Sequence, residues 1–96
     1  MTPESTLATG VAPDAARERI RATVLDVLGR IAPELDAAGL KADVELRSEL
    51  DLDSMDFLNF VIGLHEAFGI DIPEADYRKL ATLDHCVAYV AARTGA

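Results

Sequence analysis

The chain has 96 residues, half of them hydrophobic, and its 17 acidic and 9 basic residues give a formal net charge of −8. A chain this short forms one small domain with a thin core, which counts against an autonomous enzyme with a deep pocket. The negative charge argues against nucleic acid as a partner and favours partner proteins with basic surfaces.

Residues 1–12 are rich in Thr, Ser, Pro and Gly, which predicts a flexible N-terminal tail. Pro13 and Asp14 suit the first turn of a helix, so the first helix is expected to begin there. Pro33 predicts its end, because a proline disfavours the helical conformation of the residue before it. Apolar residues at helical spacing form the expected buried stripe of this helix: Ile20, Val24, Val27, Leu28 and Ile31.

A long connection is expected between the first and second helices, from Glu34 to Asp53. A connection of this length in so small a domain needs anchoring. Four spaced apolar residues are expected to pin it to the core: Leu40, Val44, Leu46 and Leu50.

The second helix is expected to start at Ser54. Serine is a preferred N-cap, and Asp56 would then lie in the first turn, where a carboxylate suits the positive end of the helix dipole. A serine at this place is exposed, and an anion joined to its oxygen would meet unpaired backbone N–H groups. For an arbitrary serine in this position, the favoured interpretation is a helix cap with no further role.

The same helix carries apolar residues on two opposite faces. At about 100° per residue, five of them share the face expected to enter the core: Phe57, Phe60, Val61, Leu64 and Phe68. Met55, Leu58 and Ile62, which we call the docking stripe, lie nearly opposite. A small bundle can hardly bury a helix on all sides, so we expect the docking stripe to be exposed for a partner.

The rest of the chain predicts two further helices. Gly69 is expected to follow the end of the second helix, and Pro73 to Tyr77 to form the first turn of a short third one. Thr82 is expected to cap the last helix, whose inward side would be Leu83, Val87 and Val90. The fold class is therefore all-α, a small three-to-four-helix bundle with a long loop between its first and second helices.

Residues that could bind metal or perform catalysis are sparse. Cys86 is the single cysteine, which excludes an internal disulfide and fits a reducing cytoplasm, and its place beside the last helix's inward side predicts a core residue. His65 and His85 have no further ligand at the right spacing, so no metal site is expected. An EF-hand calcium loop begun at Asp51 fails, because Ile62 stands where the closing glutamate should be.

The run Asp53-Ser54-Met55-Asp56, followed by Phe68-Gly69-Ile70-Asp71-Ile72-Pro73 and then Thr82-Leu83, resembles the acyl carrier proteins. The resemblance covers about residues 16–93. It implies that a phosphopantetheinyl transferase attaches 4′-phosphopantetheine from coenzyme A to Ser54, with Asp53 and Met55 flanking the attachment site. It also implies that the arm's terminal thiol carries acyl groups as thioesters. Asp51 departs from the family, since many carriers have glycine there.

The resemblance further implies that partner enzymes dock on the exposed face of the second helix. The expected partners are the transferase and the acyl-activating, acyltransferase or synthase enzymes, which would meet a monomer through basic docking surfaces. Typical carriers that serve fatty acid synthesis have acids on this face, including the positions of Asn59, His65 and Ala67. This chain keeps only Asp53, Asp56 and Glu66 of that acidic belt. The residues expected to contact partners are Met55, Asp56, Leu58, Asn59, Ile62, His65 and Glu66.

We therefore expect a carrier domain at residues 13–93, with a C-terminal tail at 94–96, serving fatty acid, lipid or polyketide biosynthesis rather than acting as an enzyme. Ser54 lacks the G-x-S-x-G elbow and an evident neighbouring base, so it would be modified rather than act as a nucleophile of its own. Two alternatives stay open. One is an aminoacyl or peptidyl carrier, although Asp51 and Leu52 replace the Gly-Gly usual in peptidyl carriers. The other is an unmodified acidic helical adaptor that binds partners through the docking stripe.

Overall fold

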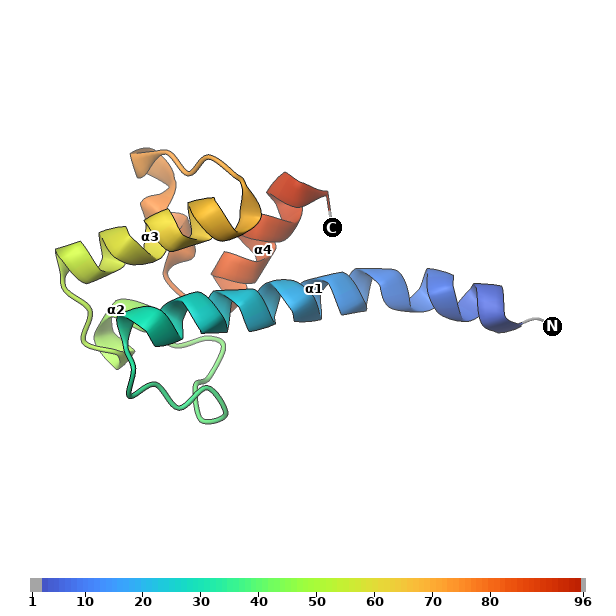
Figure 1. Ribbon diagram of the computed structural model, residues 1–96, viewed down its shortest axis with the longest axis horizontal. Helices are drawn as coiled ribbons and strands as arrows, with labels where there is room; N and C mark the ends of the chain where they lie inside the picture. Colours follow the sequence, from blue (N-terminus) through green and yellow to red (C-terminus); the bar gives the residue numbers. More distant parts are fainter. Residues whose placement is uncertain (1–2, 96) are drawn as a thin grey trace.

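The computed structural model describes the backbone of residues 3–95 and the side chains of residues 15–95, and this part of the chain is helical without strands. Its elements are α1 (Pro3–Ile31), α2 (Leu46–Glu49), α3 (Ser54–Phe68), the 3-10 helix η1 (Glu74–Leu80) and α4 (Leu83–Thr94) (Figure 1). The expected all-α bundle with a long loop after its first helix is confirmed.

Helix α1 is longer than the sequence predicted. It begins at Pro3 and not near Pro13, so the expected start is wrong, and most of the expected tail is helical. Residues 1 and 2 lie outside the described residues. Elongating an existing helix costs far less than nucleating one, so the packed second half of α1 supports turns whose own composition is unfavourable. Its end at Ile31, two residues before Pro33, agrees with the prediction.

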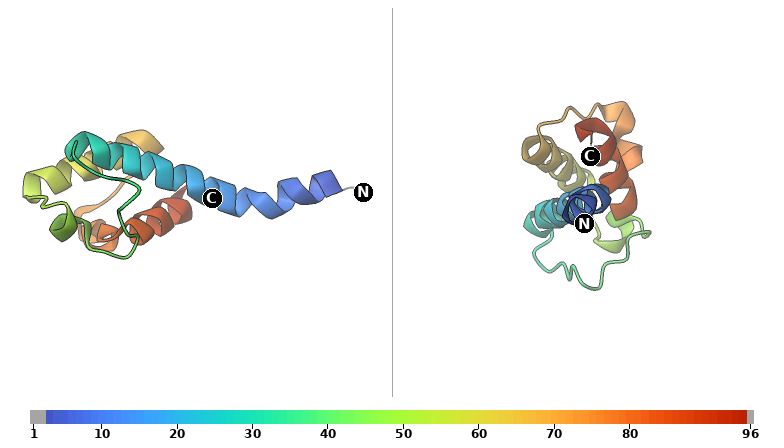
Figure 2. Two further views of the ribbon diagram at one scale, coloured as in Figure 1. Left: turned by 90° about the horizontal axis from the view of Figure 1, so that it is seen from below. Right: turned by 90° about the vertical axis from the view of Figure 1, so that its right-hand side faces the viewer.

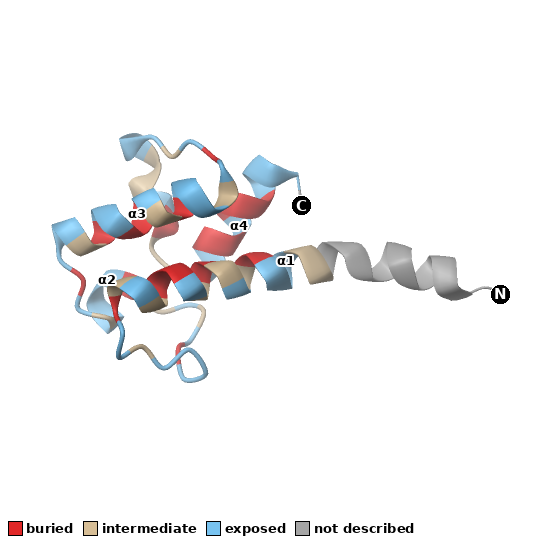
Figure 3. Cartoon of the chain, viewed as in Figure 1, coloured by how far each residue is buried: buried red, intermediate tan, exposed pale blue. Residues whose placement is uncertain are grey.

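One core joins the helices. Helix α1 packs against α3 and α4, and η1 packs against α4 (Figure 2). In Figure 3 the buried residues of α1, α3 and α4 form stripes that face one another. Ile31 and Phe68 are only partly buried at the ends of their stripes, and the other predicted core residues of α1 and α3 are buried. The largest fully buried side chains are Phe60, Leu28, Leu46, Leu64, Leu80, Leu83, Val24, Val90 and Cys86.

The connection between α1 and α3 is pinned as expected. Leu40 and Leu46 are buried, while Val44 and Leu50 pack against the core with partial exposure. The short helix α2 within it was not predicted. The backbone N–H of Leu46 donates to the carbonyl of Ala81 at 2.8 Å, which ties α2 to the end of η1.

The last two helices are joined by a polar cluster around Asp76 in η1. Its carboxylate accepts hydrogen bonds from the Tyr89 hydroxyl and from the Arg93 guanidinium, both at 2.7 Å, and Lys79 lies 3.3 Å away. The hydrogen bond from Tyr89 is the largest single cause that holds the pKa of Asp76 below its ordinary value, and Lys79 and Arg93 lower it as well. This cluster fixes η1 on α4.

The start of α4 matches the prediction. The Thr82 hydroxyl accepts from the backbone N–H of His85 at 3.1 Å, as an N-cap should, and Leu83, Val87 and Val90 are buried. Cys86 is fully buried as predicted, and burial raises the pKa of its thiol to about 12, so it stays protonated at neutral pH.

Within residues 3–95, no helix combines the length and the apolar composition needed to cross a membrane. Among the side chains of residues 15–95, no cluster of three or more His, Cys, Asp or Glu is placed to bind a metal ion.

Gly63 of α3 lies close to Val27 of α1, and this contact gives the first testable prediction. A Cβ atom at this position would lie 2.6 Å from Cγ1 of Val27, whereas a Cβ at Gly29 in α1 would meet nothing within 4 Å. Gly63→Ala should therefore lower the free energy of unfolding by about 1–3 kcal/mol through overpacking. Gly29→Ala should raise it by about 0.5–1 kcal/mol, because alanine favours the helix. Urea denaturation of both variants checks this, and effects of the same sign would contradict the close approach.

Candidate functional site

The site is built at the N-terminus of α3, where Asp53 is the N-cap. Its carboxylate accepts from the backbone N–H of Asp56 at 2.8 Å, and the Asp56 carboxylate accepts from the backbone N–H of Asp53 at 3.3 Å. The prediction that Ser54 is the N-cap is therefore wrong, and Ser54 is the first residue of the helix. The reason is the reciprocal bond, because Asp53 has a carboxylate three residues on, whereas Ser54 has Phe57 there.

Ser54 has a side chain that is free to react. It is exposed, as the sequence predicted. Among the residues that the structure describes, its hydroxyl makes no hydrogen bond to the protein. The first N–H groups of a helix lack partners within it, and they attract an anion placed at this end. The geometry thus suits an anionic group bonded to the Ser54 oxygen.

The turn before the helix brings Ser54 to this place. Asp51 has a backbone φ of 54°, the left-handed conformation that glycine adopts freely and that aspartate tolerates better than most residues. Leu52 is then buried, and its N–H donates to the carbonyl of Arg47 at 2.9 Å. The turn therefore forms with aspartate at position 51, although glycine would adopt the same conformation with less strain.

The docking stripe is exposed, as predicted. The exposed fractions are 63% for Met55, 36% for Leu58 and 44% for Ile62, and these are the large hydrophobic residues left exposed in the described part of the chain. Figure 3 shows α3 exposed on this side and buried where it faces α1 and α4. The stripe begins beside Ser54 and follows the helix away from it.

The polar residues expected on this face differ in their exposure and in the hydrogen bonds that they make. Asn59 and Glu66 are exposed, whereas Asp56 is half-buried and engaged in the cap. Nδ1 of His65 lies 2.6 Å from the carbonyl oxygen of Ile70, to which it can donate, so this ring is tied to the loop after α3. Asp56 lies in the first turn of α3 and His65 in the last.

Gly69 closes α3 as predicted, with a φ of 66° and its N–H donating to the carbonyl of His65.

A hollow of about 420 Å³, which we call the Ser54 hollow, adjoins the serine. Its lining includes Arg47, Phe57, Leu58 and Tyr77, with Ser54 at one side. The guanidinium of Arg47 lies over the ring of Phe57, 5.4 Å from its centroid. Sequence reasoning missed Arg47, although it is the sole Lys or Arg between residues 43 and 76.

Comparison with known proteins gives one family. The family model described as a phosphopantetheine attachment site matches residues 18–90. The chain is 33% identical to an acyl carrier protein of Campylobacter hominis over 73 residues, which are 76% of this chain and 86% of that protein. It is 30% identical to an acyl carrier protein of Rubrobacter xylanophilus, also over 73 residues, with coverage of 76% and 84%.

A solved structure agrees with these relatives. The structure of the acyl carrier protein from Enterococcus faecalis superposes with a TM-score of 0.58 at 25% sequence identity. The superposition covers 74% of this chain and 98% of that one.

The capping geometry generates the second prediction. Asp53→Ala should lower the free energy of unfolding of the unmodified protein by about 1 kcal/mol, because it removes the cap. Ser54→Ala should change it by only a few tenths of a kcal/mol, because its hydroxyl holds no hydrogen bond and alanine suits a helix. Thermal or urea denaturation distinguishes the two, and equal losses would contradict Asp53 as the cap.

Proposed function

Because the chain belongs to the acyl carrier protein family, whose members carry acyl groups on a covalently attached 4′-phosphopantetheine arm, we propose that Ser54 is the residue that bears the arm. The single observation that carries this proposal is the exposed Ser54 hydroxyl, free of protein hydrogen bonds, at the first residue of α3. The Ser54 hollow supports it, because it offers space next to that oxygen for the start of a flexible group.

Attachment would be carried out by a separate transferase. Acyl carrier proteins are carriers rather than catalysts, and among the described residues no side chain forms a hydrogen bond with the Ser54 hydroxyl. The transferase would take the hydroxyl proton while the Ser54 oxygen bonds to the phosphorus that bears the pantetheine. The phosphoanhydride bond of coenzyme A breaks, and adenosine bisphosphate leaves. The resulting phosphodiester would lie at the positive end of α3.

Once attached, the arm supplies a thiol that holds the acyl group as a thioester. The chain's own residues then serve to direct partner enzymes to that arm. Synthase and transferase enzymes are partners of the family, and we propose that they bind the docking stripe of Met55, Leu58 and Ile62. Asn59 and Glu66 lie exposed at its border, so they would meet the partner at the rim.

Charge supports partners with basic surfaces. Residues 43–76 contain ten acidic residues and one Lys or Arg, so the part of the chain around α3 is strongly negative. Complementary charge mainly raises the rate of encounter and disfavours wrong partners. We therefore assign encounter to the acidic surface and close contact to the docking stripe.

We assign the carrier function to residues 13–93, and the match of the family model to residues 18–90 supports this assignment. We further propose that the protein acts as a monomer in the cytoplasm, where a lone buried cysteine stays reduced. Its cargo would be an acyl group of fatty acid, lipid or polyketide biosynthesis.

Loading of Ser54 is the third prediction. Incubated with coenzyme A and a broad-specificity transferase, the wild-type protein should gain the mass of one arm, and Ser54→Ala should gain none. Ser48→Ala is the matched control, since Ser48 is an exposed serine six residues earlier, and it should load like the wild type. Intact-mass measurement checks all three, with circular dichroism to show that they are folded. Loading that survives in Ser54→Ala would overturn the assignment.

The two faces of α3 generate the fourth prediction. Phe60→Ala and Leu64→Ala should each cost about 2–5 kcal/mol of stability, because both side chains are fully buried. Leu58→Ala and Ile62→Ala should cost about 1 kcal/mol or less and yet lower kcat/KM for loading by the transferase. Denaturation curves and initial loading rates test this. Stripe variants that load at the wild-type rate would place the docking surface elsewhere.

A further inference from the structure

A groove runs from Ser54 between α2, α3 and η1. The Ser54 hollow shares Arg47, Phe57 and Tyr77 with a second hollow of about 390 Å³, which extends to Ala81. Because three lining residues are common, the two hollows adjoin, and together we call them the α2–η1 groove. Each part has the volume usual for a small-molecule site.

The floor of the groove is aromatic, and the core behind it is filled. The rings of Phe57 and Tyr77 meet edge to face with centroids 6.2 Å apart. Phe57 also contacts Phe60, which is fully buried. A group that enters from Ser54 therefore finds an apolar ledge at the surface and is kept out of the core.

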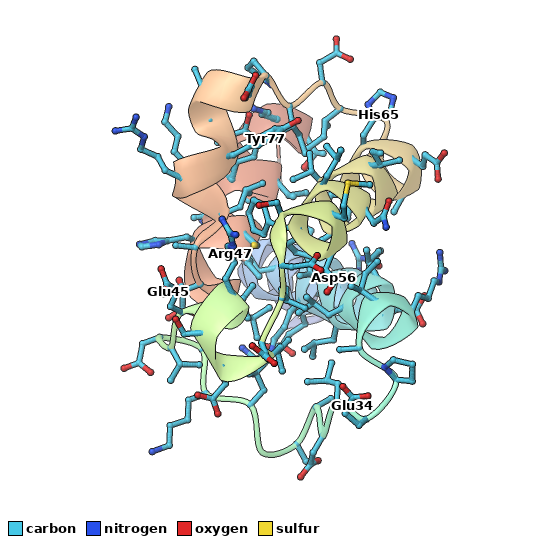
Figure 4. All side chains as sticks on the ribbon, turned by 90° about the vertical axis from the view of Figure 1, so that its left-hand side faces the viewer. Glu34, Glu45, Arg47, Asp56, His65 and Tyr77 are labelled. Atoms are coloured by element: carbon cyan, nitrogen blue, oxygen red, sulfur yellow. The ribbon has the colours of Figure 1, made fainter. Side chains whose placement is uncertain are left out.

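Arg47 brings positive charge to this ledge. It extends from α2 into the space between α3 and η1, on the side of Tyr77 (Figure 4). In the part of the chain whose side chains the structure describes, its guanidinium pairs with no carboxylate, in contrast to Arg30 and Arg93, which both do. Its recorded contact is the face of the Phe57 ring.

The surroundings of Ser54 are negatively charged, so a nearby cation would stabilise a phosphodiester on its oxygen. Asp51, Asp53 and Asp56 all lie within three residues of it, so a phosphodiester on its oxygen adds a fourth negative group to three carboxylates. Arg47 lines the same hollow as Ser54. A guanidinium has the planar donor geometry that matches phosphate oxygens and can stack on an aromatic ring at the same time.

We propose that Arg47 is a positioning residue for the arm: its guanidinium pairs with the phosphodiester on Ser54 and holds the arm in the α2–η1 groove. This inference rests on Ser54 as the attachment residue. The branched apolar part of the pantetheine, with its two methyl groups, lies on the rings of Phe57 and Tyr77. The carboxylates of Glu45 and Glu74 at the groove's rim are acceptors for its amide N–H groups.

If Arg47 only covered the Phe57 ring and had no role toward the arm, a different result would be expected. The surroundings of its guanidinium would be the same before and after loading, whereas pairing with the phosphodiester would change them. Nuclear magnetic resonance of the unmodified and the loaded full-length protein separates the two. Intact mass first confirms that each sample carries the arm.

In the loaded wild type we expect the Nε–H signal of Arg47 to shift relative to the unmodified protein. We also expect nuclear Overhauser effects between the arm's methyl groups and the rings of Phe57 and Tyr77. Both should weaken as salt is added, because an exposed ion pair is screened. In loaded Arg47→Gln the Overhauser effects should fall about two- to fivefold, and Arg47→Lys should restore part of them. Arg30→Gln, a matched change of an exposed arginine in α1, should leave them unchanged.

The outcomes separate the two proposals. A wild-type protein that gains no mass overturns Ser54 as the attachment residue, and the role of Arg47 with it. A loaded wild type without Overhauser effects to Phe57 or Tyr77 and without a shifted Arg47 signal overturns the role of Arg47 alone. Overhauser effects of full strength in loaded Arg47→Gln do the same. The wild-type comparison decides the matter even if Arg47→Gln is poorly folded.

Discussion

The structure depends on helix α3, which is buried on one face and exposed to solvent on the other. Phe60 and Leu64 fix α3 in the core, while Leu58 and Ile62 remain exposed on its other side. The reciprocal bonds between Asp53 and Asp56 fix where this helix begins. Because a helix is rigid over so few turns, these constraints hold Ser54 at a constant position relative to the docking stripe, whichever enzyme approaches.

Helical periodicity predicted most of this arrangement. The core residues of α1, α3 and α4, the exposed stripe and the caps at Gly69 and Thr82 follow from spacing and local chemistry, which the folded chain preserves. The N-cap was misassigned because Asp53 and Ser54 are both good caps, and the carboxylate three residues later decides between them. Helix α2 escaped prediction because four residues are too few to show a period. The position of Arg47 over Phe57 joins two elements, so no local pattern contains it.

We propose that charge and apolar contact have different roles in partner binding. The acidic surface around α3 would act over about a Debye length, roughly 8 Å at physiological ionic strength, and so would bring basic partners near. The docking stripe would act only at contact, where burying exposed apolar area stabilises a complex. Within residues 43–76 Arg47 is the sole Lys or Arg, and it lines the same hollow as Ser54, so we propose that it acts on the arm rather than on the partner.

The central claim is that one continuous surface, from Ser54 along the docking stripe, meets the enzymes that modify and use this carrier. Titration of the ¹⁵N-labelled unmodified protein with a catalytically inactive phosphopantetheinyl transferase tests it most directly. The account predicts that the backbone signals that shift form one patch over Ser54, Met55, Leu58 and Ile62, while the outward side of α4 is unaffected. Shifts centred on α4, with those four residues unchanged, would contradict it.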